Sequence, residues 1–202
     1  IVVDNGYEGP QSCINNLPDL SSISRIPSYS IANKNDADAI INGHFAKPGV
    51  RMIGVSQNLF RSELSGFDSS GKLIDSMNLI HQYSIGEEAT VVSQNFAFSE
   101  ARRLIDVLKN QNIDASLFNV AVSTPTSWAP VIEHAARTKR VVICDDTKSR
   151  HKASTELAYL LHSQIPGCKV VLQNRAEGEI WSLPQADQYM VQDAEVVSAL
   201  SS

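Results

Sequence analysis

The amino-acid sequence predicts an α/β protein with a mainly parallel sheet, and three observations favour this class. Short apolar segments rich in valine and isoleucine alternate with longer amphipathic segments between residues 89 and 146. Turn-forming residues stand at the boundaries between these segments. The hydrophobic content of 43% is sufficient for a full core. Strands that are joined through helices form right-handed crossovers, which cover both faces of a parallel sheet.

Residues 1–60 are expected to contribute several strands and one helix. Asn35 or Asp36 caps this helix, and Pro48-Gly49 ends it. A long loop is expected near the start of the chain, and such a loop is usually functional or ordered by a partner. The predicted elements are a strand at 1–3, a loop to about residue 20, a strand at 29–31, a helix at 37–46 and a strand at 50–55.

The stretch 61–84 shows little periodicity and carries small turn-forming residues, among them Gly66 and Gly71. We therefore predict that it is a linker that crosses the surface between two domains. The first domain is then expected to comprise residues 1–60, and the second to run from residue 85 to residue 202.

The second domain is predicted to alternate strands and helices. Ser99 stands at the N-cap position of an amphipathic helix. Thr126 or Ser127 caps the next helix, and Pro130 falls in its first turn, where a missing N–H does least harm. The predicted elements are strands at 89–92, 113–120, 141–144 and 169–172, helices at 100–110, 128–140 and 149–163, and a short terminal helix that begins at 193.

Charge and hydropathy exclude two classes of partner. The net charge is −5 and the basic residues are scattered along the chain, so no nucleic-acid partner is expected. No apolar run approaches the ~20 residues that span a bilayer, so no membrane association is expected. The cysteines are far apart and fit a reducing compartment, which indicates a cytoplasmic protein, or a mitochondrial-matrix protein in a eukaryote. The chain opens on a strand without an initiator methionine, so we expect it to be part of a longer protein.

Few residues along the chain suggest metal binding or catalysis. The histidines show no metal-binding spacing, so no metal site is predicted, and His134 and His162 are expected on exposed helix faces. Asp145-Asp146 follows a parallel strand at the edge where open α/β sheets bind ligands. Solvation, or capping of the next helix, competes with a catalytic interpretation of this pair.

The segment Gly9-Pro10-Gln11-Ser12-Cys13 is the strongest sequence candidate for a functional site. It joins a turn, a hydroxyl and a thiol on a long loop, and Gln11 and Ser12 are its candidate catalytic residues. The competing interpretation is that a loop hydroxyl bonds its own backbone. No cofactor-binding residue is identified from the residues themselves.

Several short motifs follow one another in an order that resembles thiamine-diphosphate enzymes. These motifs are GPQS at 9–12, RIP at 25–27, DADA at 36–39 and LFR at 59–61. They resemble the later half of the pyrimidine-binding domain in the β subunit of 2-oxo acid dehydrogenase E1 components. The pattern of that family includes a GPQHSQS-like loop and a strand that ends in a Leu-Tyr-Arg-like triplet.

Residues 86–93, 113–120 and 138–142 resemble three further strand motifs of the same family, in the same order. The resemblance covers nearly the whole chain. It implies part of a pyrimidine-binding domain at 1–60 and, after the linker, a transketolase C-terminal-type three-layer domain with a mainly parallel sheet at 85–202. The implied cofactor is thiamine diphosphate with magnesium, held by the full assembly only.

Departures from the family pattern limit what the resemblance implies. The family's cofactor-activating glutamate lies well before the GPQ loop, so this chain alone is not expected to bind or activate thiamine diphosphate. Ser12 stands in place of a histidine, and a hydroxyl cannot replace imidazole in proton transfer at neutral pH. Residues 149–152 replace a glycine-rich turn that makes a subunit contact. Residues 43–47 lack the acidic and amide residues of the family's cation site, so no metal is expected there.

Three functional hypotheses remain open. In the first, the chain is the C-terminal portion of an E1 β-like subunit, which supports decarboxylation of a 2-oxo acid and acyl transfer through assembly and cofactor-site formation. In the second, it is a non-catalytic assembly or regulatory module with a transketolase-like fold. In the third, it belongs to a transketolase acting on sugar phosphates, which the lack of clustered arginine and histidine disfavours. We expect a homo-oligomer or a complex with an E1 α-like subunit, because half a pyrimidine domain leaves a sheet edge and an apolar face uncovered.

Overall fold

The computed structural model describes residues 1–3, 15–56, 59, 70–175 and 189–201. Its strands are β1 (Val2–Val3), β2 (Ser28–Ile31), β3 (Met52–Ser56), β4 (Lys72–Asp75), β5 (Ile80–Ser84), β6 (Ala89–Gln94), β7 (Ala115–Val120), β8 (Arg140–Asp145) and β9 (Lys169–Asn174). Its helical segments are α1 (Leu17–Ser24), α2 (Lys34–Ile40), the π-helix η2 (Ile41–Phe45), α4 (Phe98–Asn110), α5 (Ala129–Thr138), α6 (Ala153–Gln164) and α7 (Asp193–Ser201).

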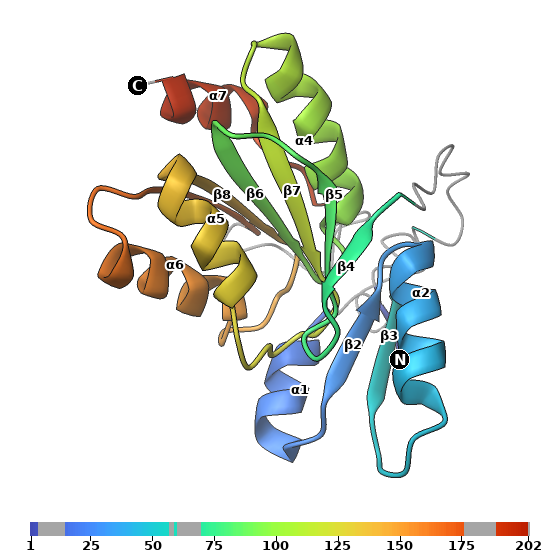
Figure 1. Cartoon of the computed structure of the whole chain (residues 1–202). Helices are drawn as coiled ribbons and strands as arrows, with labels where there is room; N and C mark the ends of the chain where they lie inside the picture. The colour runs from blue at the N-terminus through green and yellow to red at the C-terminus, as the bar shows by residue number, and fades with distance from the viewer. Residues whose placement is uncertain (4–14, 57–58, 60–69, 176–188, 202) are drawn as a thin grey trace, which may run out of the picture.

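The described strands form two sheets. The smaller sheet has the order β1-β3-β2, and the larger has the order β4-β5-β7-β6-β8-β9 (Figure 1). All pairings in the smaller sheet are parallel, and so are those among β6, β7, β8 and β9. These pairings confirm the predicted α/β class with a mainly parallel sheet.

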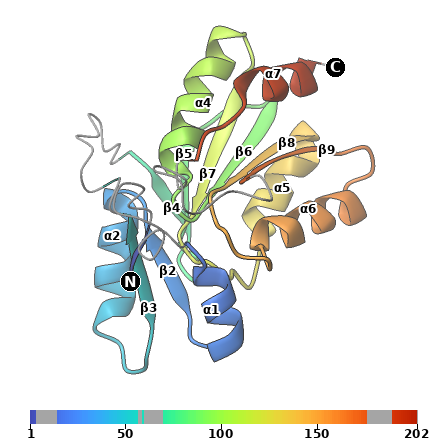
Figure 2. The ribbon, with the colours of Figure 1, turned by 180° about the vertical axis from the view of Figure 1, so that it is seen from behind.

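Helices cover both faces of the larger sheet and produce three layers. α4 and α7 pack on one face, and α5 and α6 pack on the other, as two opposite views show (Figure 1, Figure 2). On the first face Leu104 and Leu108 are fully buried, and on the second Val131 and Leu157 are fully buried. Burial of one such side chain contributes about 1.5–3 kcal/mol, so the two apolar layers hold the helices on the sheet.

The starts of two helices differ from the prediction. Ser99 does not cap α4, because the buried Phe98 already belongs to the helix and Ala97 takes the N-cap position without a side-chain bond. The N-cap of α5 is Trp128, although Ser127 Oγ still accepts the N–H of Ala129 at 3.3 Å. Apolar packing therefore sets these two boundaries. No helix in the described part of the chain has the length and the apolar character needed to cross a membrane.

The start of α6 is also later than predicted. The helix begins at Ala153 and not at Ser149. Ser149 is buried, and its Oγ accepts the N–H of Asp19 at 3.2 Å. The N–H groups of Arg150 and His151 donate to the Asp19 carboxylate, both at 3.3 Å. These bonds to α1 satisfy the backbone before α6 and delay the helix.

α1 occupies a stretch that the sequence predicted as loop. Leu17 is fully buried, and Pro18 lies in the first turn. Gly54 in β3 passes so close that a Cβ there would come within 2.4 Å of Leu17 Cδ1, so a larger residue would displace the buried Leu17 side chain. The helix has only 8 residues, too few for a clear apolar periodicity.

α2 begins and ends differently from the predicted helix. Its N-cap is Asn33, and neither Asn35 nor Asp36 takes that role, because Asn33 Oδ1 accepts the N–H of Asp36 at 3.0 Å. The helix continues into η2, where Ile41 and Phe45 are 53% and 65% exposed instead of buried. A π turn is wider than an α turn, so it rotates these side chains away from the buried face.

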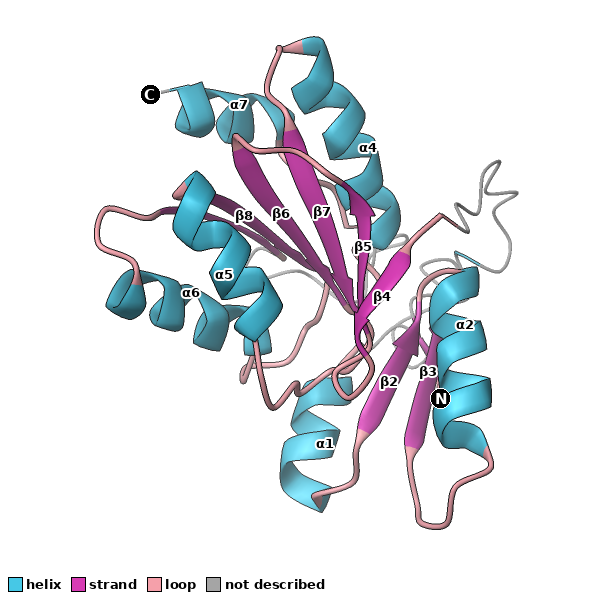
Figure 3. Ribbon diagram, viewed as in Figure 1, coloured by secondary structure: helices cyan, strands magenta, loops and turns pink. Residues whose placement is uncertain are grey.

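Residues 72–84, inside the stretch expected to be a linker, form a hairpin of the larger sheet. β4 and β5 pair antiparallel, and β5 also pairs antiparallel with β7 (Figure 3). The linker prediction therefore does not hold for these residues, whose strands are short and carry polar side chains. Residues 61–69 lie outside the described residues, and the division into domains at 1–60 and 85–202 stays a prediction.

The two sheets meet along a seam between β2 and the segment that follows β7. The Ser30 N–H donates to the Ala121 carbonyl at 2.8 Å, and the Ser123 N–H donates to the Ser28 carbonyl at 3.0 Å. A separate apolar cluster fills this seam, formed by Tyr29, Ile40, Leu79, Ala121 and Val122. The seam places α2 against the larger sheet.

Candidate functional site

The loop site predicted from the sequence lies outside the described residues. Gln11, Ser12 and Cys13 all fall between residues 4 and 14, and their role stays a prediction. The described residues contain several buried polar clusters and surface hollows, and one of these clusters lies at the carboxyl edge of the larger sheet.

Asp145 and Asp146 follow one another at the carboxyl end of β8, and both are buried. The Asp145 carboxylate accepts hydrogen bonds from Ser154 Oγ at 2.7 Å, from Asn95 Nδ2 at 2.8 Å and from the Thr147 N–H at 3.0 Å. Burial raises the pKa of Asp145, and these donors oppose the shift because they favour the charged form. The expected solvation of this pair is therefore wrong, and Asp145 instead holds the first turn of α6 through Ser154.

Asp146 ties together segments that are far apart in the sequence. Its carboxylate accepts the Phe96 N–H at 2.8 Å, and Asn15 Nδ2 lies 3.1 Å from both carboxylate oxygens. Its backbone carbonyl accepts a hydrogen bond from Arg175 Nε at 2.5 Å. This arrangement closes the carboxyl edge around Asp146, which makes the residue a packing element of the fold.

A second buried carboxylate, Asp36, lies at the seam between the two sheets. Its two oxygens lie 3.0 and 2.9 Å from Asn119 Nδ2, and Oδ2 also accepts the Ala32 N–H at 3.2 Å. His81 Nδ1 lies 3.5 Å from Asp36 Oδ1 and makes no hydrogen bond to a described residue. Burial raises the pKa of Asp36 to about 7 and lowers the pKa of His81. Burial therefore favours the protonated form of Asp36 and the neutral form of His81.

The Asp36–His81 pair belongs to a polar network that crosses the core. Asn119 Oδ1 accepts a hydrogen bond from Ser93 Oγ at 2.6 Å, while its amide group donates to Asp36. Sequence reasoning missed this network because its members come from four elements that are distant along the chain. One signal was available: Ser93 and Asn119 are polar residues within strands that are otherwise apolar.

His134 is buried, so its predicted exposure is wrong, whereas His162 is exposed as expected. His134 Nε2 lies 3.0 Å from the Gly86 carbonyl, and Nδ1 lies 2.8 Å from Thr90 Oγ1. Since a carbonyl only accepts, Nε2 carries the proton and Nδ1 accepts from the threonine. Both ring nitrogens are bonded, and burial lowers the pKa of His134, so this histidine is a neutral structural residue that joins α5 to β6.

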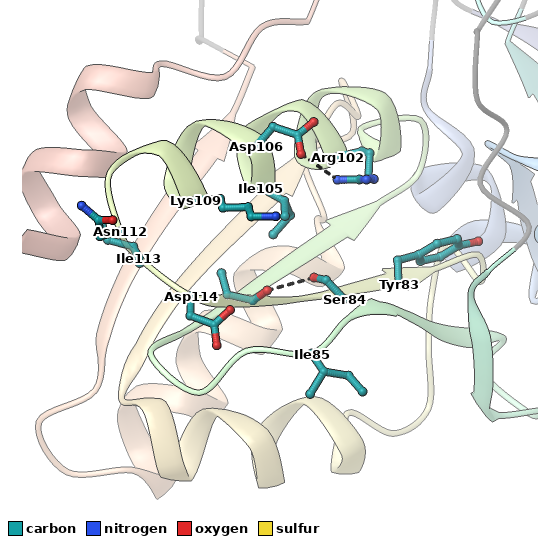
Figure 4. A pocket seen from close by; sticks show the side chains of 11 residues that line it. Tyr83, Ser84, Ile85, Arg102, Ile105, Asp106, Lys109, Asn112, Ile113 and Asp114 are labelled. Carbon is teal, nitrogen blue, oxygen red and sulfur yellow. Dashed lines mark hydrogen bonds and ion pairs between the residues drawn. The ribbon is translucent and has the colours of Figure 1, made fainter.

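A hollow of about 470 Å³ lies between α4, the end of β5 and the start of β7 (Figure 4). On its wall Arg102 and Asp106 form an ion pair at 3.2 Å. Ser84 Oγ donates to the Ala115 carbonyl at 2.9 Å on the opposite side. None of the described residues that line this hollow is a buried acid or a histidine, so it offers surface charge without an acid–base pair.

A second hollow, of about 490 Å³, lies between the α2–η2 helix and the β4–β5 hairpin, and His81 lines it. His81 therefore joins the wall of this hollow to the fully buried Asp36, and we take the Asp36–His81 pair as the candidate site. Cys144 and Cys168 are both buried, and burial raises the pKa of Cys144 to about 12, so neither offers an accessible thiolate. Among the described residues no group of three or more His, Cys, Asp or Glu side chains is placed to hold a metal ion.

The three-layer domain joined to a smaller parallel sheet defines a class of fold, that of transketolase-type proteins. No family model matches the sequence, and no curated protein matches it. A solved structure described as a split gene transketolase, inactive beta4 tetramer, is similar with a TM-score of 0.68 and 17% identity. The transketolase of Campylobacter jejuni subsp. jejuni NCTC 11168 is similar with a TM-score of 0.56 and 12% identity.

Both similarities extend over 96% of this chain. The chain covers 63% of the split gene transketolase chain and 27% of the Campylobacter jejuni transketolase chain. At these identities the similarity concerns the fold, which agrees with the expected transketolase-type architecture. The chain therefore corresponds to part of the longer proteins that share this fold.

Proposed function

We propose that this chain is the C-terminal portion of a thiamine-diphosphate-dependent 2-oxo acid dehydrogenase, as an E1 β-like subunit. In this proposal it supports decarboxylation and acyl transfer by building the subunit interface and one wall of the cofactor site. The observation that carries the proposal is the transketolase-type fold over 96% of the chain. The order of the GPQS, RIP and LFR motifs supports the choice of the β subunit.

The described residues do not by themselves fit the cofactor. Magnesium requires several oxygen ligands, and no described cluster of three or more acidic or histidine residues can hold a metal ion. When bound in a full assembly, thiamine diphosphate supplies the carbanion chemistry of decarboxylation. The contribution that we assign to the described residues is therefore structural.

This structural contribution is the fixed position of the smaller sheet on the larger one. Asp36 joins α2 to β7 through Asn119, and Asp146 joins β8 to the segment before α1 through Asn15. Both links are buried, where a hydrogen bond contributes about 0.5–1.5 kcal/mol, and about 1.5–3 kcal/mol when one partner is charged. A wall of a cofactor site must be held rigidly for chemistry to be efficient, and these links supply that rigidity.

A transketolase acting on sugar phosphates is the second candidate. The observation that favours it is the description of both similar solved structures as transketolases. A third candidate is a non-catalytic assembly or regulatory module. It is favoured by the similar structure that is described as an inactive tetramer, and by Ser12 at the position of a family histidine.

The test compares the isolated chain with the complex that the chain forms in its natural source. The complex is purified through a tag on this chain, and binding of thiamine diphosphate with magnesium is measured by calorimetry. Turnover is then measured with a panel of 2-oxo acids and an artificial electron acceptor. We expect no cofactor binding by the isolated chain, and both binding and 2-oxo acid decarboxylation by the complex.

Each other outcome selects among the candidates. Ketol transfer between sugar phosphates without decarboxylation would identify the chain as part of a transketolase and overturn the proposal. A stable complex that binds no cofactor would overturn the proposal and identify the chain as a non-catalytic assembly module. Cofactor activation by the isolated chain overturns the idea that the site forms only on assembly.

A further inference from the structure

We draw no further inference here: the strongest candidate, the surface hollow between α4, the end of β5 and the start of β7 with the exposed Ile85 at its rim, carries none because nothing in the structure shows what covers it.

Discussion

Two buried acidic clusters hold this molecule together, and they differ in the groups that lie against the carboxylate. Asp145 at the carboxyl edge of the larger sheet receives three hydrogen bonds from a side-chain amide, a hydroxyl and a backbone N–H. Asp36 at the seam also receives amide donors, but His81 beside it has an unpaired ring nitrogen and lines a cavity. Asp145 is therefore held by neutral donors, whereas Asp36 also lies against a titratable side chain, that of His81.

The two buried histidines show the same contrast. His134 uses both ring nitrogens, one at the Gly86 carbonyl and one at the Thr90 hydroxyl. His81 lies against Asp36 at 3.5 Å without a hydrogen bond from Nδ1. Burial lowers the pKa of both residues, so the pKa direction alone does not separate the two roles. The difference is in the hydrogen-bond partners.

The largest effect is expected from Asp145→Ala. The substitution leaves three buried donors without their acceptor, and we expect the free energy of unfolding to fall by about 3–5 kcal/mol. Urea unfolding measures this loss. The matched control is Asp106→Ala, an exposed aspartate whose pair with Arg102 contributes less than about 0.5 kcal/mol. Similar losses in both variants would contradict the structural role of the buried cluster.

The next largest effect is a pH dependence of the free energy of unfolding that arises from Asp36. Its pKa of about 7 in the folded protein lies above the ordinary value of 3.8, so the folded state binds this proton more tightly than the unfolded chain does. The contribution of Asp36 to the free energy of unfolding is complete below about pH 4. It falls by a few kcal/mol as the pH rises to about 7. Asp36→Asn removes this loss, so the variant should gain stability relative to the original protein between these pH values.

The contribution of His81 to the free energy of unfolding changes with pH in the opposite direction over part of this range. Its lowered pKa favours the neutral folded form, so this contribution grows as the pH rises towards about 6.5. Urea unfolding at several pH values, with both Asp36→Asn and His81→Gln, separates the two contributions. A difference between Asp36→Asn and the original protein that stays constant over this pH range would show that folding does not raise the pKa of Asp36.

A smaller effect is expected at the fully paired histidine. Thr90→Val removes the hydroxyl that donates to His134 Nδ1, and the unpaired nitrogen should cost about 1–2 kcal/mol of unfolding free energy. Thr90→Ser keeps the hydroxyl and serves as the control, with a loss well below that of the valine variant. Thermal unfolding of the two variants measures the difference. Equal losses would mean that packing of the methyl group, and not the hydrogen bond, matters at this position.

The smallest effect is expected at the end of α5, outside both clusters, and it serves as a reference for the other variants. Lys139 ends α5 in the left-handed region at φ 53°, where glycine is favoured. Lys139→Gly is therefore expected to raise the free energy of unfolding by about 0.5–1 kcal/mol. Denaturant unfolding checks this gain, and a loss of stability would show that the lysine side chain contributes more than its backbone conformation costs.

The parallel core was predictable because its strands and helices carry clear apolar patterns. The helix α4 and the strands β6, β7 and β8 were expected from residues such as Leu104, Leu108, Val91 and Val142, which are all fully buried. The β4–β5 hairpin was not expected, since its short strands owe their conformation to pairing with each other and, for β5, with β7, and not to a local pattern.

The candidate site could not be found from the sequence. Asp36 was expected as a possible helix cap and His81 as one of several scattered histidines, because nothing local to either residue indicates the other. Only the hairpin places His81 beside α2, and the hairpin itself was not predicted. The loop at Gln11 and Ser12, which the sequence favoured as the site, lies outside the described residues, and its role stays a prediction.

The most direct test of the proposed function is native mass spectrometry of the complex that contains this chain in its source. The measurement gives the subunit composition and any bound thiamine diphosphate at the same time. We predict an oligomer in which this chain is accompanied by the cofactor and magnesium. A monomer, or an oligomer whose mass leaves no room for the cofactor, would contradict the proposal that the chain helps to form a thiamine-diphosphate site.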